Sequence, residues 1–341
     1  MNAVGAGKLR RSVVLAVLVG VSLLVGAGFV AERGASGAAA AVVVAPFVEQ
    51  GGMVPAGGAA GAGRGIALSA DGNTLLTGGF VYRRSGSRWR QSAVAGGVNA
   101  PPVAALSADG HTAMVRRLLG GVSVFMASGS RWATGHVLHG PGAEFGTAIA
   151  LSAGGNTALI SAPSSGTSGV VWMFSRASSG WTRSATPITA NPRGNDFGDV
   201  LALSADGKTA MIEEGGATVV FTRSGSTWTQ RDKLNDLFLL SMSASGRSAL
   251  LLSGQSRVKW AVAASPARWK IEPGPSLPGG RTPTNAVLSA DGTTALLGFG
   301  HRRARRRRVG LHAIGLEVDP TRQQTRWPRP TVSRCGLCAV R

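Results

Sequence analysis

The 341-residue sequence contains two cysteines, one tyrosine and 15% charged residues. Cys335 and Cys338 both lie at the end of the chain, so they cannot cross-link the body, and a disulfide scaffold is excluded. With 44% hydrophobic residues, the composition also argues against a disordered chain. After residue 41 there is no apolar pattern of helix length, while glycine occurs 50 times. Many short strands joined by turns are therefore expected.

Acidic residues are scarce, and the excess of positive charge is unevenly distributed. Lys and Arg number 36 against 16 Asp and Glu, which gives a net charge of +20. Residues 301–341 carry +9 of this and residues 1–40 carry +3, which leaves +8 for residues 41–300. That value is modest for a body of this size, so we expect no nucleic-acid partner. The arginine run His301–Arg308 would bind polyanions if exposed, and the alternative is a solvated, disordered tail.

The amino terminus has the order of regions found in an export signal. Lys8, Arg10 and Arg11 precede an uncharged run over 12–31, and small residues follow at 34–41. This pattern predicts a signal peptide over residues 1–40. The run is also long enough to span a bilayer, so an uncleaved anchor stays open as the alternative and as the only membrane contact. Either way, the body is expected to be secreted or on the cell surface.

The body is built from a repeated phrase that combines a strand, a tight turn and a returning strand. Successive copies start 38, 45, 52, 39 and 46 residues apart. Periods in this range are typical of propeller blades, with the variable length in loops. The copies are LSADGNT at Leu68, LSADGHT at Leu106, LSAGGNT at Leu151, LSADGKT at Leu203, MSASGRS at Met242 and LSADGTT at Leu288.

Each repeat can be divided into four strands. In the fourth copy the strands are expected at Val200–Ala205, Thr209–Ile212, Thr218–Thr222 and Thr227–Gln230, with a tight turn at Asp206-Gly207. The predicted fold is all-β: a β-propeller of about six four-stranded antiparallel blades, the last one incomplete. It occupies residues 41–300.

Tryptophan and aspartate each recur at a fixed position of the repeat. A residue repeated in every blade usually has a structural role, so we expect the tryptophans to pack the outer strands rather than stack a ligand. We expect the aspartates before glycine to stabilise their turns. The tryptophans are Trp89, Trp132, Trp181, Trp228 and Trp269, and the aspartates are Asp71, Asp109, Asp206 and Asp291.

The phrase FGTAIALSAGGNTALISAP at Phe145, followed by VVWMFSRASSGW, resembles bacterial FG-GAP repeat proteins, whose blades are similar to the N-terminal propeller of the integrin α-subunit. A second copy starts at Phe197, and the resemblance covers residues 62 to about 300. Another resemblance, to periplasmic propellers with an SPDG turn, shares only the hairpin. Blades of the integrin type that bind calcium carry several carboxylates in one loop, whereas each turn here offers at most one. The family's metal site is therefore not carried over, and no cofactor or metal ligand is assigned.

This absence leads to a calcium prediction. Adding millimolar calcium, or a chelator, is expected to leave the melting temperature unchanged, because a ligand bound only by the folded state must raise it. A calcium-dependent rise in melting temperature would show that loop carbonyls supply the missing ligands.

The sequence offers no constellation for catalysis. No G-x-S-x-G occurs, and His136 and His139 are interpreted as solvated loop residues without a third ligand nearby. Glu213 and Glu214 are adjacent, so on a strand they point to opposite faces and cannot flank one bond. No blade shows an extra buried acid or histidine near its inner strand. The catalytic residues are therefore predicted as none, and the binding residues stay unknown.

Together these features predict a monomeric, exported, non-catalytic binding or adhesion module whose partner is an unidentified protein or glycan, and not an enzyme. One alternative is a secreted propeller hydrolase or lyase whose acids meet at the central channel. The second is a degenerate, truncated repeat protein without a partner. We also expect Pro46–Gln50 to close the ring as an outer strand of the last blade.

The sixth repeat starts normally at Leu288 and loses its blade features from about residue 299, where arginine becomes frequent. Val309–Trp327 can be encoded so that an offset of one base reads WAFTRSGSKWTQQGSKLV, which repeats the FTRSGS, WTQ and KL of Phe221–Leu234. We therefore predict that residues 301–341 are a frame-shifted, disordered tail that cannot supply the third and fourth strands of the blade. Codons in the gene that are incompatible with this offset reading would refute the frame shift.

Overall fold

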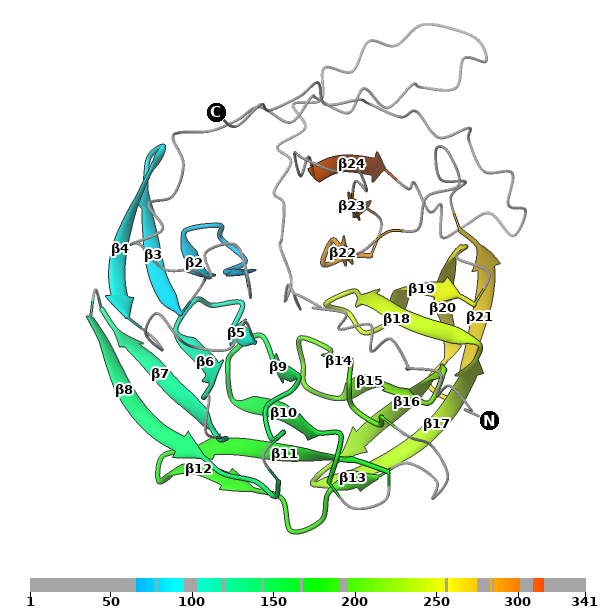
Figure 1. Ribbon diagram of the computed structural model, residues 1–341, viewed down its shortest axis with the longest axis horizontal. Coiled ribbons are helices and arrows are strands. Elements are labelled where there is room, and N and C mark those ends of the chain that lie inside the picture. The colour runs from blue at the N-terminus through cyan, green and yellow to red at the C-terminus, as the bar shows by residue number, and fades with distance from the viewer. Residues whose placement is uncertain are drawn as a thin grey trace, which may run out of the picture.

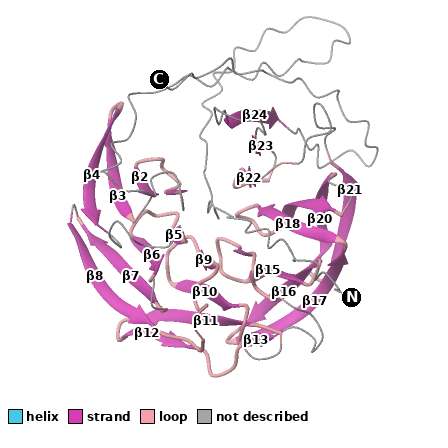
Figure 2. Ribbon diagram, viewed as in Figure 1, coloured by secondary structure: helices cyan, strands magenta, loops and turns pink. Residues whose placement is uncertain are grey.

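The computed structural model describes residues 66–77, 79–94, 103–117, 120–129, 131–142, 144–165, 168–189, 196–254, 257–274, 283, 285–292, 294–300 and 309–315. All regular elements in these ranges are strands, and no described helix is long and apolar enough to cross a membrane. The strands form six separate antiparallel sheets arranged around a common centre (Figures 1 and 2). The all-β propeller predicted from the repeats is confirmed.

Each sheet follows the chain from the centre of the ring outward. The first blade contains β1 (Ala67–Leu68), β2 (Thr74–Thr77), β3 (Phe80–Ser85) and β4 (Arg88–Val94), and the second contains β5 (Ala104–Leu106), β6 (Thr112–Arg116), β7 (Val122–Ser128) and β8 (Arg131–Leu138). The third contains β9 (Ile149–Leu151), β10 (Thr157–Ala162), β11 (Val170–Ala177), β12 (Gly180–Arg183) and β13 (Ile188–Thr189). Strands β12 and β13 pair with opposite halves of β11, so together they form a divided outer strand.

The remaining blades repeat the same order. The fourth contains β14 (Leu201–Leu203), β15 (Thr209–Glu214), β16 (Ala217–Ser224) and β17 (Thr227–Asn235). The fifth contains β18 (Leu237–Met242), β19 (Ser248–Ser253), β20 (Val258–Ser265) and β21 (Arg268–Pro273), and the sixth contains β22 (Asn285–Leu288), β23 (Thr294–Gly300) and β24 (Val309–Gly315).

Strand β24 corrects one expectation. Val309–Gly315 pairs antiparallel with β23 over its whole length, so the tail does supply a third strand to the sixth blade. Strand β24 coincides with the start of the stretch whose offset reading gives WAFTRSG. Its backbone can pair with β23 because the hydrogen bonds of a β-ladder join main-chain groups and do not depend on side-chain identity. The rest of residues 301–341, the predicted signal over 1–40 and the closing strand over 46–50 lie outside the described residues.

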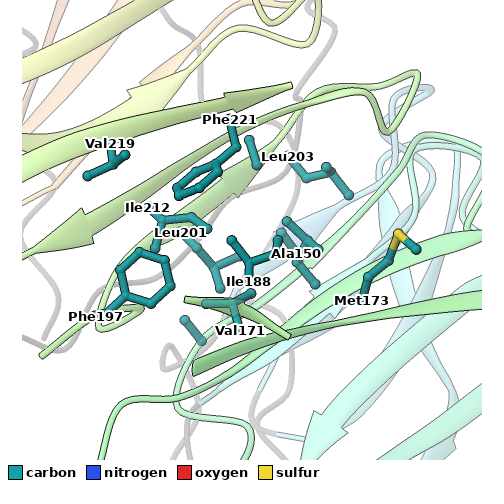
Figure 3. Close-up of a cluster of buried hydrophobic side chains, with 13 residues drawn as sticks. Ala150, Val171, Met173, Ile188, Phe197, Leu201, Leu203, Ile212, Val219 and Phe221 are labelled. Atoms are coloured by element: carbon teal, nitrogen blue, oxygen red, sulfur yellow. The ribbon is translucent and has the colours of Figure 1, made fainter. Parts of the chain in front are cut away.

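Alternating side chains pack each blade against the next. Between the third and fourth blades, Leu201, Ile212 and Phe221 face Ala150 and Val171 across the interface (Figure 3). The repeated tryptophans join these cores. Trp228 donates its indole N–H to the sulfur of Met173 in the preceding blade at 3.3 Å, and Trp269 is buried between the fourth and fifth blades. The structural role predicted for the tryptophans is therefore confirmed at these positions.

The repeated SADG turns are stabilised as expected. In the fourth blade, Asp206 accepts hydrogen bonds from the Ser204 hydroxyl at 2.5 Å and from the Lys208 amide at 2.9 Å. The Ser204 hydroxyl oxygen also accepts the Thr209 amide at 2.9 Å, where the next strand begins. The carboxylate and the hydroxyl thus hold the turn by binding nearby backbone amides.

Backbone hydrogen bonds also link these turns from one blade to the next. We name this series the turn belt, and it runs through all six described turns on one end of the ring. Its bonds are Ala70 N–H to Ala108 O, Asp109 N–H to Ala153 O, Ala153 N–H to Ala205 O, Ala205 N–H to Ala244 O and Ser245 N–H to Ala290 O.

Candidate functional site

The end of the ring opposite the turn belt carries the Phe-Gly pairs, and we name it the FG face. Here β9 and β14 begin while β10 and β15 end, because neighbouring strands are antiparallel. The amide of Gly146 donates to Ser161 O at 2.8 Å, and the amide of Gly198 donates to Glu213 O at 2.9 Å. The two Phe-Gly loops therefore bind the end of the second strand of their own blades in the same way.

One position at the end of the second strand varies between otherwise similar repeats. Arg116, Ser161 and Glu213 occupy it in the second, third and fourth blades. Their amides donate equivalent hydrogen bonds to Val103 O, Ala148 O and Val200 O. The preceding residues, TAMV, TALI and TAMI, are nearly constant, and all but Thr209 are buried. A position that varies within a constant frame, on the face formed by loops, is typical of a functional site. Comparison of the six repeats column by column could have found it.

Glu213 is the most perturbed acid on the FG face. Burial raises the pKa of its carboxyl to about 7, and the charge of Asp199 acts in the same direction, whereas a hydrogen bond from the Leu239 amide opposes both. That amide donates to Oε1 at 2.7 Å. The pairing of β18 with β19 shifts register between Leu239 and Ser241, and such a bulge redirects backbone groups away from the ladder. Glu213 is thus held against the innermost strand of the next blade.

Three further carboxylates belong to the loops of this face. Asp199 directly precedes β14, and its pKa is raised by partial desolvation and by the negative charges of Asp196 and Glu144. Asp196 has a positive φ of 67°, a conformation that is strained for a residue with a side chain and that is found often at functional sites. Glu144 accepts a hydrogen bond from the Ser164 hydroxyl. Because the charges of Asp196 and Glu144 act on Asp199, the three carboxylates lie on one patch that spans the third and fourth blades.

Arg116 adds a positive charge to the same face. Burial lowers the pKa of its guanidinium, and the nearby charge of Glu144 opposes that shift. Its side chain packs beside Gly146, where an added Cβ would lie 3.2 Å from Arg116 Cγ. The residues Glu213, Asp199, Asp196, Glu144 and Arg116 therefore bring a carboxyl that titrates near neutral pH, further acids and a cation to the FG face.

The structure tests the sequence interpretation of the adjacent glutamates. Glu214 is buried and forms an ion pair at 3.0 Å with Lys233 on β17 of its own blade, while Glu213 contacts the next blade. They point to opposite faces, as the strand alternation predicted. The accompanying inference, that no blade carries a buried acid near an inner strand, is wrong, because the half-buried Glu213 carboxylate binds the Leu239 amide of β18.

His136 lies on β8, so its assignment to a loop is wrong, and His139 directly follows that strand; both side chains are exposed. No group of three metal-ligating side chains occurs among the described residues. Sequence reasoning assigned no catalytic residue and so missed Glu213 and Asp199. The reason is that a raised pKa depends on contacts with another blade, which no local pattern reveals.

Comparison with known proteins supports the fold. No protein-family model and no curated protein matches the sequence. Among solved structures, the chain is similar to a periplasmic gluconolactonase from Pseudomonas aeruginosa, with a TM-score of 0.54 and 16% identity over 78% of this chain and 85% of that one. It is also similar to a protein from Lactobacillus plantarum (TM-score 0.53, 13% identity, 75% of this chain and 76% of that one) and to a functionally unknown protein from Desulfotomaculum acetoxidans (TM-score 0.56, 14% identity, 76% and 83%). The propeller fold is shared, while nothing found supports the FG-GAP family itself.

These findings correct the predicted function. The non-catalytic adhesion module was inferred from the integrin-like resemblance and from the supposed lack of an acid near an inner strand. No family model supports the integrin-like resemblance, and a structurally similar protein is named as a gluconolactonase, an enzyme. Glu213 is an acid with a raised pKa beside the inner strand of the next blade.

The raised pKa of Glu213 makes the free energy of unfolding depend on pH. An acid whose folded pKa lies above its unfolded value of 4.5 binds more protons when folded, so stability falls as pH rises from about 4.5 to about 7. The expected loss is on the order of 3 kcal/mol. In urea denaturation at several pH values, E213Q should lack this part of the decline, and an equally steep decline in E213Q would contradict the assignment.

Proposed function

We propose that this protein is an exported propeller hydrolase that opens a sugar lactone or a related ester on its FG face. The observation that carries the proposal is the Glu213 carboxyl, which titrates near pH 7 beside Asp199. A general base works best when its pKa is close to the working pH. The similar periplasmic gluconolactonase supports the substrate class and the exported location, and the predicted signal over residues 1–40 supports export independently.

The roles follow from the chemistry of lactone hydrolysis. Ionised Glu213 takes a proton from a water molecule, and the hydroxide attacks the carbonyl carbon. Negative charge then develops on the carbonyl oxygen, and we assign its stabilisation to Arg116, the partly buried cation of the second blade. The ring C–O bond breaks, and the proton held by Glu213 goes to the departing ring oxygen. The products are one carboxylic acid and one hydroxyl on the same molecule, so water is the only co-reactant.

Asp199 contributes by its charge. While it is ionised it disfavours a second negative charge on Glu213, which helps to keep the Glu213 pKa near neutrality. The carboxylates on this face also suit a substrate with many hydroxyls, because each carboxylate oxygen accepts hydrogen bonds and donates none. A sugar lactone fits this requirement better than an anionic substrate does.

The proposal is tested with the purified full chain and three substrates: glucono-δ-lactone, p-nitrophenyl acetate and p-nitrophenyl β-glucoside. Proton release in weakly buffered solution between pH 6 and 8 follows lactone opening against the spontaneous background. Lactone or ester turnover, with no glucoside turnover, is the expected result. If the folded protein accelerates neither the lactone nor the ester, the proposed function is wrong.

A further inference from the structure

The outer strands of the first blade carry a concentration of arginines that no other described blade has. Residues 66–94 contain Arg83, Arg84, Arg88 and Arg90, and their single carboxylate, Asp71, is engaged in its own turn. Arg83 and Arg90 are direct cross-strand partners on β3 and β4, and Ser85 pairs with Arg88 two positions along. We name Arg83, Arg88 and Arg90 the arginine cluster.

The other blades act as internal controls for this position. Where the first blade pairs Arg83 with Arg90, the following four blades pair Met126 with Ala133, Ser175 with Thr182, Thr222 with Thr229 and Val262 with Lys270. Like charges directly opposite one another on a sheet are destabilising. The fold therefore does not require two arginines here, and an uncharged pair is the usual solution.

The arginine cluster lies on the side of the first blade that faces the second. An Nη of Arg83 donates to Gly129 O in the second blade at 3.2 Å, while its Nε is buried and has no hydrogen-bond partner. Since partners alternate across the sheet, Arg88 and Arg90 lie on the same side of the blade, and both are exposed. None of the three arginines is in an ion pair described by the structure. Arg84, on the other side, is held by Asn73 and by the ring of Trp89.

We propose that the arginine cluster binds an oxyanion of the phosphate class that carries two or more negative charges. Cross-strand partners place their Cβ atoms about 5 Å apart, and residues two apart on a strand lie about 7 Å from one another. The three side chains thus leave neighbouring positions on the same side of the sheet. A divalent oxyanion bound to the arginine cluster would accept charge-assisted hydrogen bonds from more than one guanidinium group. Its negative charge would offset the repulsion between the arginines. The site is separate from the FG face of the third and fourth blades.

The test measures binding of inorganic pyrophosphate and of long-chain polyphosphate to the full chain, by calorimetry and by thermal denaturation. Pyrophosphate represents a free anion, and polyphosphate represents the same chemistry on a polymer. Both should raise the melting temperature of the wild type. R90Q should weaken binding about tenfold or more, because Arg90 is exposed and its replacement leaves the bond from Arg83 to Gly129 intact.

The matched control is R268Q. Arg268 in the fifth blade is also an exposed arginine opposite a serine, so its replacement changes the net charge equally in a different blade. It should weaken binding less than about twofold. Binding of polyphosphate alone, lost in R90Q and kept in R268Q, would still support the site and identify a polymer as its source. Equal weakening in R90Q and R268Q, or no binding of either probe, would overturn the proposal.

A second variant separates a ligand site from a structural one. R90T copies Thr229, its counterpart in the fourth blade, and removes the like-charge pair. Without ligand it should raise the melting temperature by about 1–3 °C, while pyrophosphate binding falls. A lower melting temperature for R90T would show that the arginine pair stabilises the blade, and that would overturn the argument from repulsion.

Discussion

E213Q is expected to reduce kcat/KM for lactone opening by about 10²–10⁴-fold, the usual contribution of a general base. Glutamine has nearly the same shape, and its carbonyl oxygen can still accept the amide of Leu239, so the fold should be kept. Only the ability to take a proton is lost. The wild-type rate should rise with pH through an apparent pKa of about 7, and the residual rate of E213Q should lack this step.

The matched control for this prediction is D206N. It removes a carboxylate by the same change in the same blade, but Asp206 lies on the turn belt, at the opposite end of the ring from Glu213. Its kcat/KM and pH profile should stay within about twofold of the wild type, because surface charges at that distance are screened. Activity in E213Q equal to that of D206N would remove Glu213 from the mechanism while leaving the lactonase proposal to the substrate assay.

Gly155→Ala is expected to lower the free energy of unfolding by about 2–4 kcal/mol. The residue has a φ of +61°, which side chains rarely adopt, and an added Cβ would lie 2.5 Å from Thr112 Oγ1 and 2.7 Å from Thr112 Cβ in the preceding blade. The conformation alone accounts for about 1 kcal/mol, and overpacking against the buried threonine adds about 1–3 kcal/mol. Urea denaturation measures the total.

Gly225→Ala separates these two contributions. Its φ of +59° is almost the same, and nothing lies within 4 Å of its added Cβ. It should lose about 1 kcal/mol only. If the two variants lose equal stability, the close approach between neighbouring blades contributes nothing and the repeated glycine is explained by its backbone conformation alone.

The repeats allowed the architecture to be predicted because the information they carry is local. A strand, its SADG turn and the returning strand are specified within about a dozen residues, and the alternation of buried side chains defines which face packs on the next blade. The turn role of Asp206 and the packing role of Trp228 followed from repetition in the same way. Loop lengths between blades did not affect these predictions.

The site was not predictable by the same means. Glu213 and Glu214 look equivalent in the sequence, and only the contact of Glu213 with Leu239 in the next blade distinguishes them. The pKa of Glu213 then depends on burial between blades and on Asp199, which precedes a different strand. Strand β24 was missed for another reason: the sequence of residues 309–315 does not repeat the third strand of the other blades, although the backbone pairs with β23.

The turn belt makes the six sheets a linear array in which every blade is bonded to its nearest neighbours. Within the described residues the belt begins at Ala70 and ends at Ala290, so the array has two termini. In such a system, opening starts at the termini and moves inward, and the middle units are protected longest. Amide hydrogens of the third and fourth blades should therefore exchange most slowly. Glu213 and Asp199 are on the fourth of the six blades, so the reactive groups occupy the part of the molecule that opens last.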